Sequence, residues 1–214
     1  MERVHAFLWR LHSPSIPPGM NHSYTSPAHR ALRATLATAL TLLVLVGAAP
    51  QTQAQSALTS GFNHTCALLE GGTAKCWGRG GEGRLGYGDT DHRGDGPGEM
   101  GADLPAIDLG TGLTAKQIEA GNDHTCAVLS NNTVKCWGRG GEGRLGYGDS
   151  NHRGDGGGEM GNALPAVDLG TGLTAKQVEA GNSHTCALLS DNTVKCWGLG
   201  NEGRLGYGDS NHRG

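Results

Sequence analysis

Short runs in which apolar and polar residues alternate follow one another along the chain, separated by glycine-rich segments. In the middle of the chain these runs span residues 116–120 (KQIEA), 124–129 (HTCAVL), 134–137 (VKCW) and 164–169 (LPAVDL). Short alternating runs bounded by glycine are typical of β-strands, and none has the 3.6-residue period of a helix. Pro165 lacks a backbone donor, so the fourth run is predicted to be an edge strand. The pattern therefore predicts an all-β unit of four short strands.

The pattern recurs with a period of 60 residues. Cysteine recurs at positions 66, 126 and 186 and tryptophan at positions 77, 137 and 197, and residues 121–154 match residues 181–214 at all but five positions. Four-stranded units in tandem are what the blades of a β-propeller require, whereas the rungs of a β-solenoid are usually shorter than this unit. We predict propeller repeats at residues 55–116 and 117–176 and a partial third repeat at residues 177–214.

Each repeat contains two cysteines separated by nine residues. If residues 130–132 form a three-residue hairpin loop, Val128 faces Val134 and Cys126 faces Cys136. Such loops favour Gly or Asn at the left-handed position, which holds Gly72, Asn132 and Asn192 in the three repeats. Facing cysteines in an exported protein should oxidise, so the predicted disulfides are Cys66–Cys76, Cys126–Cys136 and Cys186–Cys196. Zinc is the alternative, but this spacing lacks the tight C-x2-4-C pattern of zinc sites.

Residues 1–54 differ from the repeats. Arg30 and Arg33 precede an uncharged, largely apolar run at residues 34–49, and a small-residue site ending at Ala54 follows. This order is the pattern of a cleaved signal peptide, with Met20 as an alternative start. A membrane anchor is the other interpretation, although the run is shorter than the roughly 20 residues that a spanning helix needs. We predict export to a periplasm, the cell surface or the medium.

Removal of residues 1–54 leaves an acidic protein. The whole chain has 17 basic and 20 acidic residues, and this segment holds four and one of them, so the remainder has a net charge near −6 with histidine neutral. A surface of that sign repels phosphate backbones. The composition therefore argues against a nucleic-acid partner.

Residues 120–149 (AGNDHTCAVLSNNTVKCWGRGGEGRLGYGD) resemble the repeat of the regulator of chromosome condensation family, which runs A-G-x-x-H-(T/S)-x-A-L, G-x-V-x-x-W-G and N-x-x-G-Q-L-G-x-G. The resemblance recurs three times over residues 57–214. The chain departs from the family pattern in the unit's length, which residues 93–104 extend, and at single positions: Arg84, Arg144 and Arg204 replace the usual Gln, Gly81 and Gly141 the usual Asn, and Glu119 a small residue.

The resemblance implies a seven-bladed β-propeller, of which this chain would supply about two and two-thirds repeats. So few blades cannot close a ring and would expose sheet edges. We expect either a fragment of a longer product, which is the favoured interpretation, or self-assembly of several copies. The family's namesake activity, nucleotide exchange on a small GTPase of the Ran type with chromatin binding, is also implied. Export, disulfides and negative charge all oppose it.

Three loop motifs suggest sites. Residues 78–83 satisfy G-x-G-x-x-G, but more glycines follow instead of the helix that a dinucleotide site needs. Clustered oxygen ligands suggest calcium, although the spacing departs from an EF-hand. Residues 93–95 and 153–155 spell the Arg-Gly-Asp tripeptide of cell-adhesion ligands. The candidate calcium ligands are Asp89, Asp91, Asp95 and Glu99, with Asp149, Asn151, Asp155 and Glu159 in the next repeat.

Two further sets of residues recur with the repeat. His64, His124 and His184 begin a strand, and we expect them to hold the blades by hydrogen bonds rather than to act as bases. Trp77, Trp137 and Trp197 are expected to pack between blades, with a ligand groove as the alternative. Residues 130–137 share the skeleton of the Asp-box of sialidase-type propellers, S-x-D-x-G-x-T-W, and so suggest a BNR-like repeat.

The sequence leads us to assign no catalytic, cofactor-binding or metal-ligating residue. The leading hypothesis is an exported, non-enzymatic propeller that binds a protein or a glycan through loops on one face. Variation between repeats at Asp123/Ser183, Asn131/Asp191 and Arg139/Leu199 supports it. The alternatives are a glycan hydrolase or lyase whose paired carboxylates lie in missing blades, and the exchange-factor activity named above.

Overall fold

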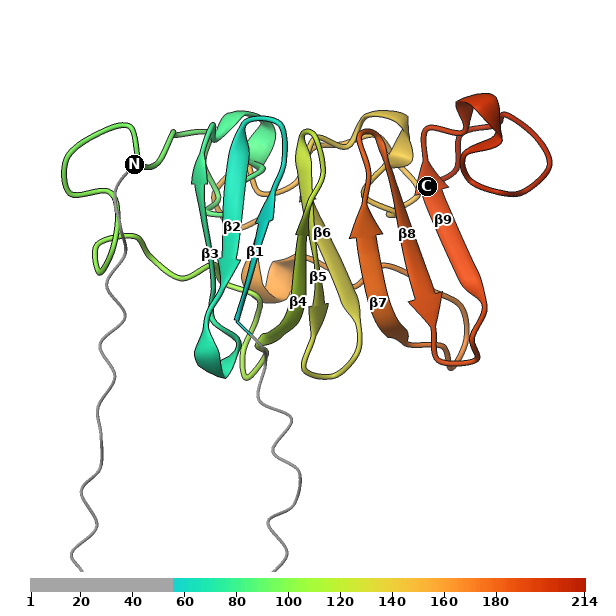
Figure 1. Cartoon of the computed structure of the whole chain (residues 1–214), viewed down its shortest axis with the longest axis horizontal. Helices are drawn as coiled ribbons and strands as arrows, with labels where there is room; N and C mark the ends of the chain where they lie inside the picture. Colours follow the sequence, from blue (N-terminus) through green and yellow to red (C-terminus); the bar gives the residue numbers. More distant parts are fainter. Residues whose placement is uncertain (1–55) are drawn as a thin grey trace, which may run out of the picture. The chain divides into compact units, whose positions relative to one another are not determined.

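The computed structural model describes residues 56–214, so the predicted signal peptide lies outside the described residues. Each repeat forms one three-stranded antiparallel sheet, and the three sheets stand side by side (Figure 1). Within residues 56–214, no helix has the length and apolar content to cross a membrane. The strands are β1 (Ala57–Ser60), β2 (His64–Leu68) and β3 (Ala74–Gly78); β4 (Ala115–Ala120), β5 (His124–Leu129) and β6 (Val134–Gly138); and β7 (Ala175–Ala180), β8 (His184–Leu189) and β9 (Val194–Gly198).

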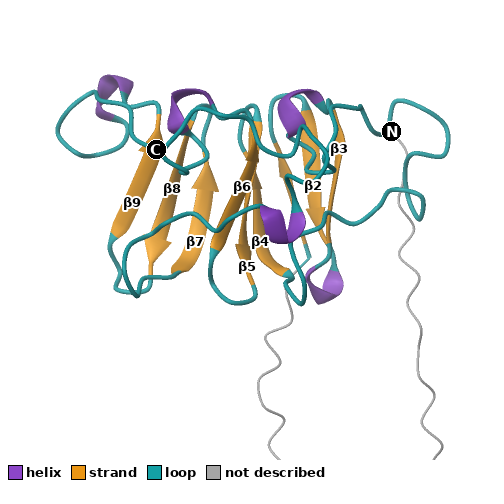
Figure 2. Cartoon of the chain, turned by 180° about the vertical axis from the view of Figure 1, so that it is seen from behind, coloured by secondary structure: helices purple, strands orange, loops and turns teal. Residues whose placement is uncertain are grey.

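Single 3-10 turns connect the strands. They are η1 (Glu70–Gly72), η2 (Gly81–Gly83), η3 (Gly141–Gly143), η4 (Gly161–Ala163) and η5 (Asn201–Gly203). Figure 2, which views the chain from the side opposite to Figure 1, shows the long connections crossing in front of the sheets. Strands β4 and β7 begin at Ala115 and Ala175, so the predicted repeat boundaries at 117 and 177 fall inside these strands.

The predicted hairpin is confirmed. Val128 pairs with Val134 and Cys126 with Cys136, and Asn132 has a φ of 64° in the left-handed region that the loop requires. The three predicted disulfides are present: Cys66–Cys76, Cys126–Cys136 and Cys186–Cys196, each with 4.1 Å between the Cα atoms. The N–H of Cys136 points away from β5, so the cysteines form a non-hydrogen-bonded pair, in which facing side chains are closest. Three disulfides indicate an oxidising environment.

The prediction of a fourth strand at residues 164–169, and hence of four-stranded blades, is wrong. Of residues 164–169, which the structure describes in full, only Val167 forms a backbone hydrogen bond with β6: its N–H lies 2.8 Å from the carbonyl oxygen of Val134. Pro165 has no N–H to donate, and the next ladder position on β6 is taken by a side chain, because the hydroxyl of Tyr147 contacts both the N–H and the C=O of Cys136. Arg153 then pairs with Gly138 as an isolated bridge. Three separate segments therefore line the edge where one strand was expected.

The hydrophobic core lies between the sheets. Each sheet has a front face, which packs on the following repeat, and a back face, which packs on the preceding one. The front face of the first sheet contributes Cys66, Leu68, Ala74, Cys76 and Leu85 to the first core cluster, and the back face of the second sheet contributes Ala115, Ile118, Ala127, Leu129 and Trp137. The second cluster uses the equivalent positions one repeat later. Successive repeats are therefore joined by the same front-to-back junction.

Candidate functional site

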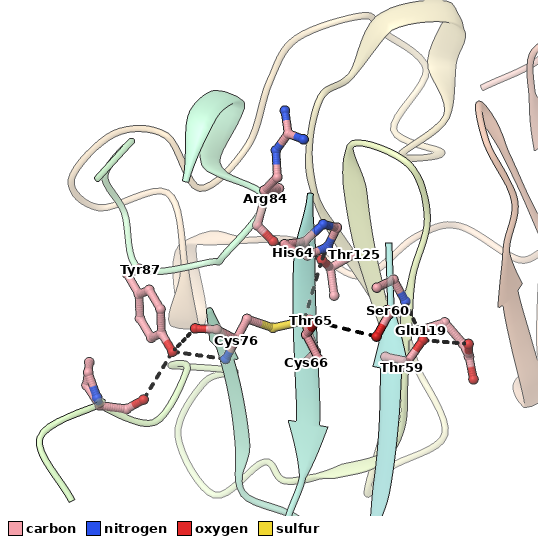
Figure 3. The surroundings of a disulfide bond; sticks show 12 residues. Thr59, Ser60, His64, Thr65, Cys66, Cys76, Arg84, Tyr87, Glu119 and Thr125 are labelled. Atoms are coloured by element: carbon pink, nitrogen blue, oxygen red, sulfur yellow. Dashed lines mark hydrogen bonds between the residues drawn. A yellow bond between two sulfur atoms is a disulfide. The ribbon is translucent and has the colours of Figure 1, made fainter. Parts of the chain in front are cut away.

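A chain of buried hydrogen bonds crosses each junction beside the disulfide, and Figure 3 shows the residues of the first junction. The hydroxyl of Thr125 in the second repeat donates to the backbone oxygen of Arg84 at 2.8 Å. Its single proton is thereby used, so Nε2 of His64, 2.9 Å away, must be the donor in their contact. His124, Thr185 and Arg144 repeat the arrangement at the second junction. The prediction that the histidines hold the blades together is confirmed.

These histidines are neutral. Burial, helped by the nearby Arg84, lowers the pKa of His64 to about 4, and burial lowers the pKa of His124 to about 3. Nδ1 of each ring is buried without a hydrogen-bond partner among the described residues, so no side chain of this part of the protein orients the ring for proton transfer. This geometry suits a structural contact.

The lowered pKa values predict that stability falls with acidity. A histidine whose folded-state pKa is depressed takes up a proton on unfolding, so its contribution is complete above its unfolded pKa of about 6.5 and is lost as the pH falls from there toward 4. We expect the free energy of unfolding to drop by about 1.4 kcal/mol per pH unit for each buried histidine in that window. Denaturant titrations at pH 7, 6 and 5 measure this slope. A free energy that stays level between pH 7 and pH 5 would contradict it.

The first junction also contains a buried ion pair. The guanidinium of Arg84 donates to Asp123 at 2.6 Å and to the carboxylate of Glu82, and its Nε donates to Gly81 O at 2.9 Å. At the second junction Arg144 is equally buried but Ser183 replaces the aspartate. In the sequence these arginines stand out only as departures from the family's Gln. Their salt-bridge role was missed.

The inner strands of neighbouring sheets are also linked. The amide of Gln117 donates to the backbone oxygen of Val178 at 2.8 Å and accepts from its N–H at 2.9 Å, so one side chain bridges β4 and β7. Glu119 accepts hydrogen bonds from Thr59 and Gln117, and its partial burial raises its pKa. The glutamate thus serves a junction contact.

A tyrosine and an arginine close the loop after each 3-10 turn. The Tyr87 hydroxyl bonds to both backbone groups of Cys76, as Figure 3 shows. Arg93 stacks on the Tyr87 ring, 5.3 Å from its centroid, and pairs with Asp89 at 2.7 Å. The arginine of the Arg-Gly-Asp tripeptide is therefore engaged within its own loop, and so is Arg153 with Asp149.

The candidate calcium ligands do not converge. Glu99 accepts hydrogen bonds from the N–H groups of Gly94, Asp95 and Gly96, at 2.8–3.1 Å, and these bonds, that of Gly96 first, lower its pKa. Glu159 is held in the same way. Within the described residues, no group of three or more His, Cys, Asp or Glu side chains is placed to hold a metal ion.

Two of the three recurring tryptophans, Trp137 and Trp197, pack between repeats as predicted, whereas Trp77 is only partly buried. Trp137 and Trp197 are buried on the back faces of their sheets, and Trp137 lies directly on Gly86, where a Cβ would come within 2.6 Å of its Nε1.

The G-x-G-x-x-G motif does not start a helix, because its last three residues form the single turn η2. Lys135 was not predicted to have a role. It is buried and donates from Nζ to the backbone oxygens of Leu109 and Gly161, and burial lowers its pKa.

Several positions that vary between repeats lie at one end of the sheets, which we call the loop end and which comprises residues 61–63 and 79–93 and their equivalents. Asp123 and Arg139 meet there, with 3.7 Å between the ion-pair atoms. Their counterparts are Asn63 and Arg79 in the first repeat and Ser183 and Leu199 in the third. Asn131 and Asp191 lie in the hairpin turns at the opposite end (Figure 1).

A groove of about 290 Å³ crosses the loop end. Its lining comes from the same turn in each repeat: Ser60, Gly61 and Phe62; Ala120, Gly121 and Asn122; and Ala180, Gly181 and Asn182. Phe62 is 77% exposed, and the equivalent residue in each of the other two repeats is Asn. A second cleft, of about 400 Å³, lies at the first junction between Tyr87, Arg93, Asp108 and Met160. The loop end therefore combines a hollow, an exposed aromatic ring and the variable charges.

Comparison with known families settles the ancestry of the repeats. A model described as the regulator of chromosome condensation (RCC1) repeat matches residues 56–84, 115–144 and 175–204, and a second model with this description matches residues 76–128. The chain belongs to the RCC1 repeat family. Its sheets are blades of an incomplete RCC1-type β-propeller.

Relatives and solved structures agree with this RCC1 assignment. The chain is 35% identical to the ultraviolet-B receptor UVR8 of Arabidopsis thaliana over 72% of its own length and 31% of that protein, and 30% identical to the human E3 ubiquitin-protein ligase HERC2, of which it covers 3%. The structure of Prp20p from Saccharomyces cerevisiae matches with a TM-score of 0.51 at 25% identity, over 72% of this chain and 34% of that one. Human WBSCR16 shares the fold, with a TM-score of 0.55 at 18% identity over 74% and 39%. The chain thus spans under a third of the length of UVR8.

Proposed function

We propose that this RCC1-repeat chain is an exported, non-enzymatic scaffold that binds a protein through its loop end. The observation that carries the proposal is the gathering there of Phe62, the groove and the positions that vary between repeats. In the rest of each repeat the recurring side chains have structural roles within the chain, because the disulfides, the tyrosine hydroxyls and the buried histidines hold the strands and junctions together. Export is supported by the signal-like segment at residues 1–54 and by the disulfides.

A protein partner fits this surface better than a glycan. Aromatic residues, phenylalanine included, and arginine are enriched in protein–protein interfaces relative to the rest of the surface. Phe62 and Arg79 both belong to the loop end of the first repeat, and Arg79 is half exposed. Prp20p, which shares the fold, binds Gsp1p and histones, and this supports protein recognition as a use of such propellers.

Replacement of Phe62 by Asn, the residue of the other two repeats, tests the proposal. We expect Phe62→Asn to weaken binding of the partner recovered from the cell envelope or medium by about tenfold or more, as loss of an interface anchor does. The exchange of Asp123 and Arg139 for Ser and Leu, the residues of the third repeat, should weaken it further. Affinity is measured on the immobilised chain by surface plasmon resonance.

Asn131→Asp is the matched control, because it introduces a natural repeat residue at the opposite end and should leave binding unchanged. Equal affinity for all the variants would contradict the assignment of the loop end. Binding to a glycan panel, with no protein recovered, would show that the scaffold recognises sugars instead.

A further inference from the structure

The buried arginines of the two junctions differ in one hydrogen bond. The side chains of Arg84 and Arg144 are 1% and 2% exposed. Each donates from Nε, at 2.9 Å, to the backbone oxygen of the residue three positions earlier in the chain. Each also donates from Nη2 to a glutamate carboxylate, that of Glu82 or Glu142. The remaining nitrogen of the guanidinium, Nη1, is where they differ.

Nη1 has a carboxylate partner at the first junction alone. Nη1 of Arg84 donates to Asp123, whose carboxylate oxygen lies 2.6 Å away. Nη1 of Arg144 has no hydrogen-bond acceptor among residues 56–214, because Ser183 stands at the equivalent position and its hydroxyl donates instead to Oδ1 of Asn182 at 3.1 Å. Burial removes most of the water from a charged group, so a guanidinium with one free donor favours an anionic ligand.

The backbone around this position is arranged in the same way at both junctions. The N–H of Leu199 donates to the carbonyl oxygen of Ser183 at 2.9 Å, and the equivalent bond at the first junction, from Arg139 to Asp123, has the same length. Ser183 therefore occupies the place of Asp123 with a shorter side chain. The Asp123 side chain is 15% exposed, so solvent reaches this place at the loop end. All of these residues belong to the first two junctions, so the arrangement does not depend on further repeats.

We propose that the second junction binds a carboxylate group on Nη1 of Arg144, in the place that Asp123 fills at the first junction. A carboxylate is the group that this chain itself sets on the equivalent nitrogen of Arg84. Glu142 is no obstacle, because the guanidinium of Arg84 binds two carboxylates at once, those of Glu82 and Asp123.

The charges around the site favour a singly charged group over a phosphate. At the first junction a second cation, Arg139, lies 3.7 Å from Asp123. Its counterpart at the second junction is the apolar Leu199, so Arg144 alone provides the free donor there. The carboxylate has two possible sources with the same chemistry. One is an acidic side chain of the protein partner, which rests on the function proposed above, and the other is a small carboxylic acid in solution.

Titration of the oxidised chain with sodium acetate tests the site. In heteronuclear NMR spectra of the isotopically labelled chain, acetate should shift the N–H signals of Ser183 and Leu199, and the shifts should saturate in the millimolar range. Sodium chloride at the same ionic strength is the control and should not produce these shifts.

Two variants exchange the residues of the two junctions. Ser183→Asp places a carboxylate of the chain in the site and should raise the acetate concentration for half-saturation by about tenfold or more. Asp123→Ser should create a second acetate site at the first junction. Asn131→Asp adds the same charge at the opposite end of the sheets and should leave the titration unchanged. Near-ultraviolet circular dichroism checks that the variants are folded.

The affinity of the Ser183→Asp variant for the partner recovered from the cell envelope or medium identifies the source of the carboxylate. A loss of about tenfold or more indicates an acidic side chain of the partner. Unchanged affinity, with acetate binding lost, indicates a small carboxylic acid. Acetate binding without any recovered partner would support the site and count against the scaffold function. Acetate shifts that are absent, that equal those of chloride, or that Ser183→Asp leaves unaltered would overturn the proposal.

Discussion

Replacement of Trp137 by alanine is expected to lower the free energy of unfolding by about 3–5 kcal/mol. Trp137 is fully buried in the first core cluster and lies on Gly86 of the preceding repeat. Removing the indole leaves a cavity that the flanking strands cannot fill, because Cys126–Cys136 ties β5 to β6 directly beside it. Guanidinium denaturation followed by circular dichroism measures the loss.

Trp77→Ala is the control for this prediction. Trp77 occupies the same position in the first repeat but is only partly buried, since no described repeat covers it. We expect its replacement to lower the free energy of unfolding by less than half as much as the replacement of Trp137. Equal losses for the two variants would show that the indole stabilises its own sheet and not the junction.

Replacement of Thr125 by valine is expected to lower the free energy of unfolding by about 2–4 kcal/mol. Valine has nearly the shape of threonine, so packing is retained, but Nε2 of His64 and the carbonyl oxygen of Arg84 both lose their hydrogen-bond partner. Each buried polar group left unsatisfied costs about 1–3 kcal/mol. The same denaturation experiment measures the change.

Thr65→Val provides the matched comparison. Thr65 stands at the equivalent position of β2, and its hydroxyl has only a 3.4 Å contact with Ser60 at an exposed site. A surface substitution of this kind should change stability by less than about 0.5 kcal/mol. If both valine variants lose the same amount, the histidine–threonine contact does not hold the junction.

Local features of the fold could be predicted from the sequence because their causes are local. The hairpin followed from the cysteine spacing and from Asn132, which has a positive φ at the position where the loop requires one, and that register placed Cys126 opposite Cys136. The histidine role could be anticipated because His and Thr recur together in each repeat. Their partners, however, lie in the next repeat, a contact that no short-range pattern specifies.

The error about the fourth strand arose because a side chain takes a hydrogen-bonding position that a backbone strand was expected to take. A fourth strand was expected because residues 164–169 alternate in polarity, yet the ladder position beside Cys136 is filled by Tyr147, which lies eleven residues away in the sequence. The recurring Gly-Tyr-Gly was a signal that could have been used. The salt-bridge role of Arg84 was missed for another reason, because its partner Asp123 lies in the next repeat, 39 residues further along the chain. The positions that vary between repeats were expected on one face. Asp123 and Arg139 do lie at the loop end, but Asn131 lies at the opposite end of the sheets.

The tyrosine contact has a consequence for solubility. An exposed strand with free N–H and C=O groups is a template on which a strand from another molecule can form, which leads to aggregation. On β3, β6 and β9, a tyrosine hydroxyl engages both groups of the cysteine and an arginine engages both groups of the last glycine, so these positions cannot pair with an incoming backbone. The second half of β3, β6 and β9 is thereby protected from the addition of a strand from another molecule.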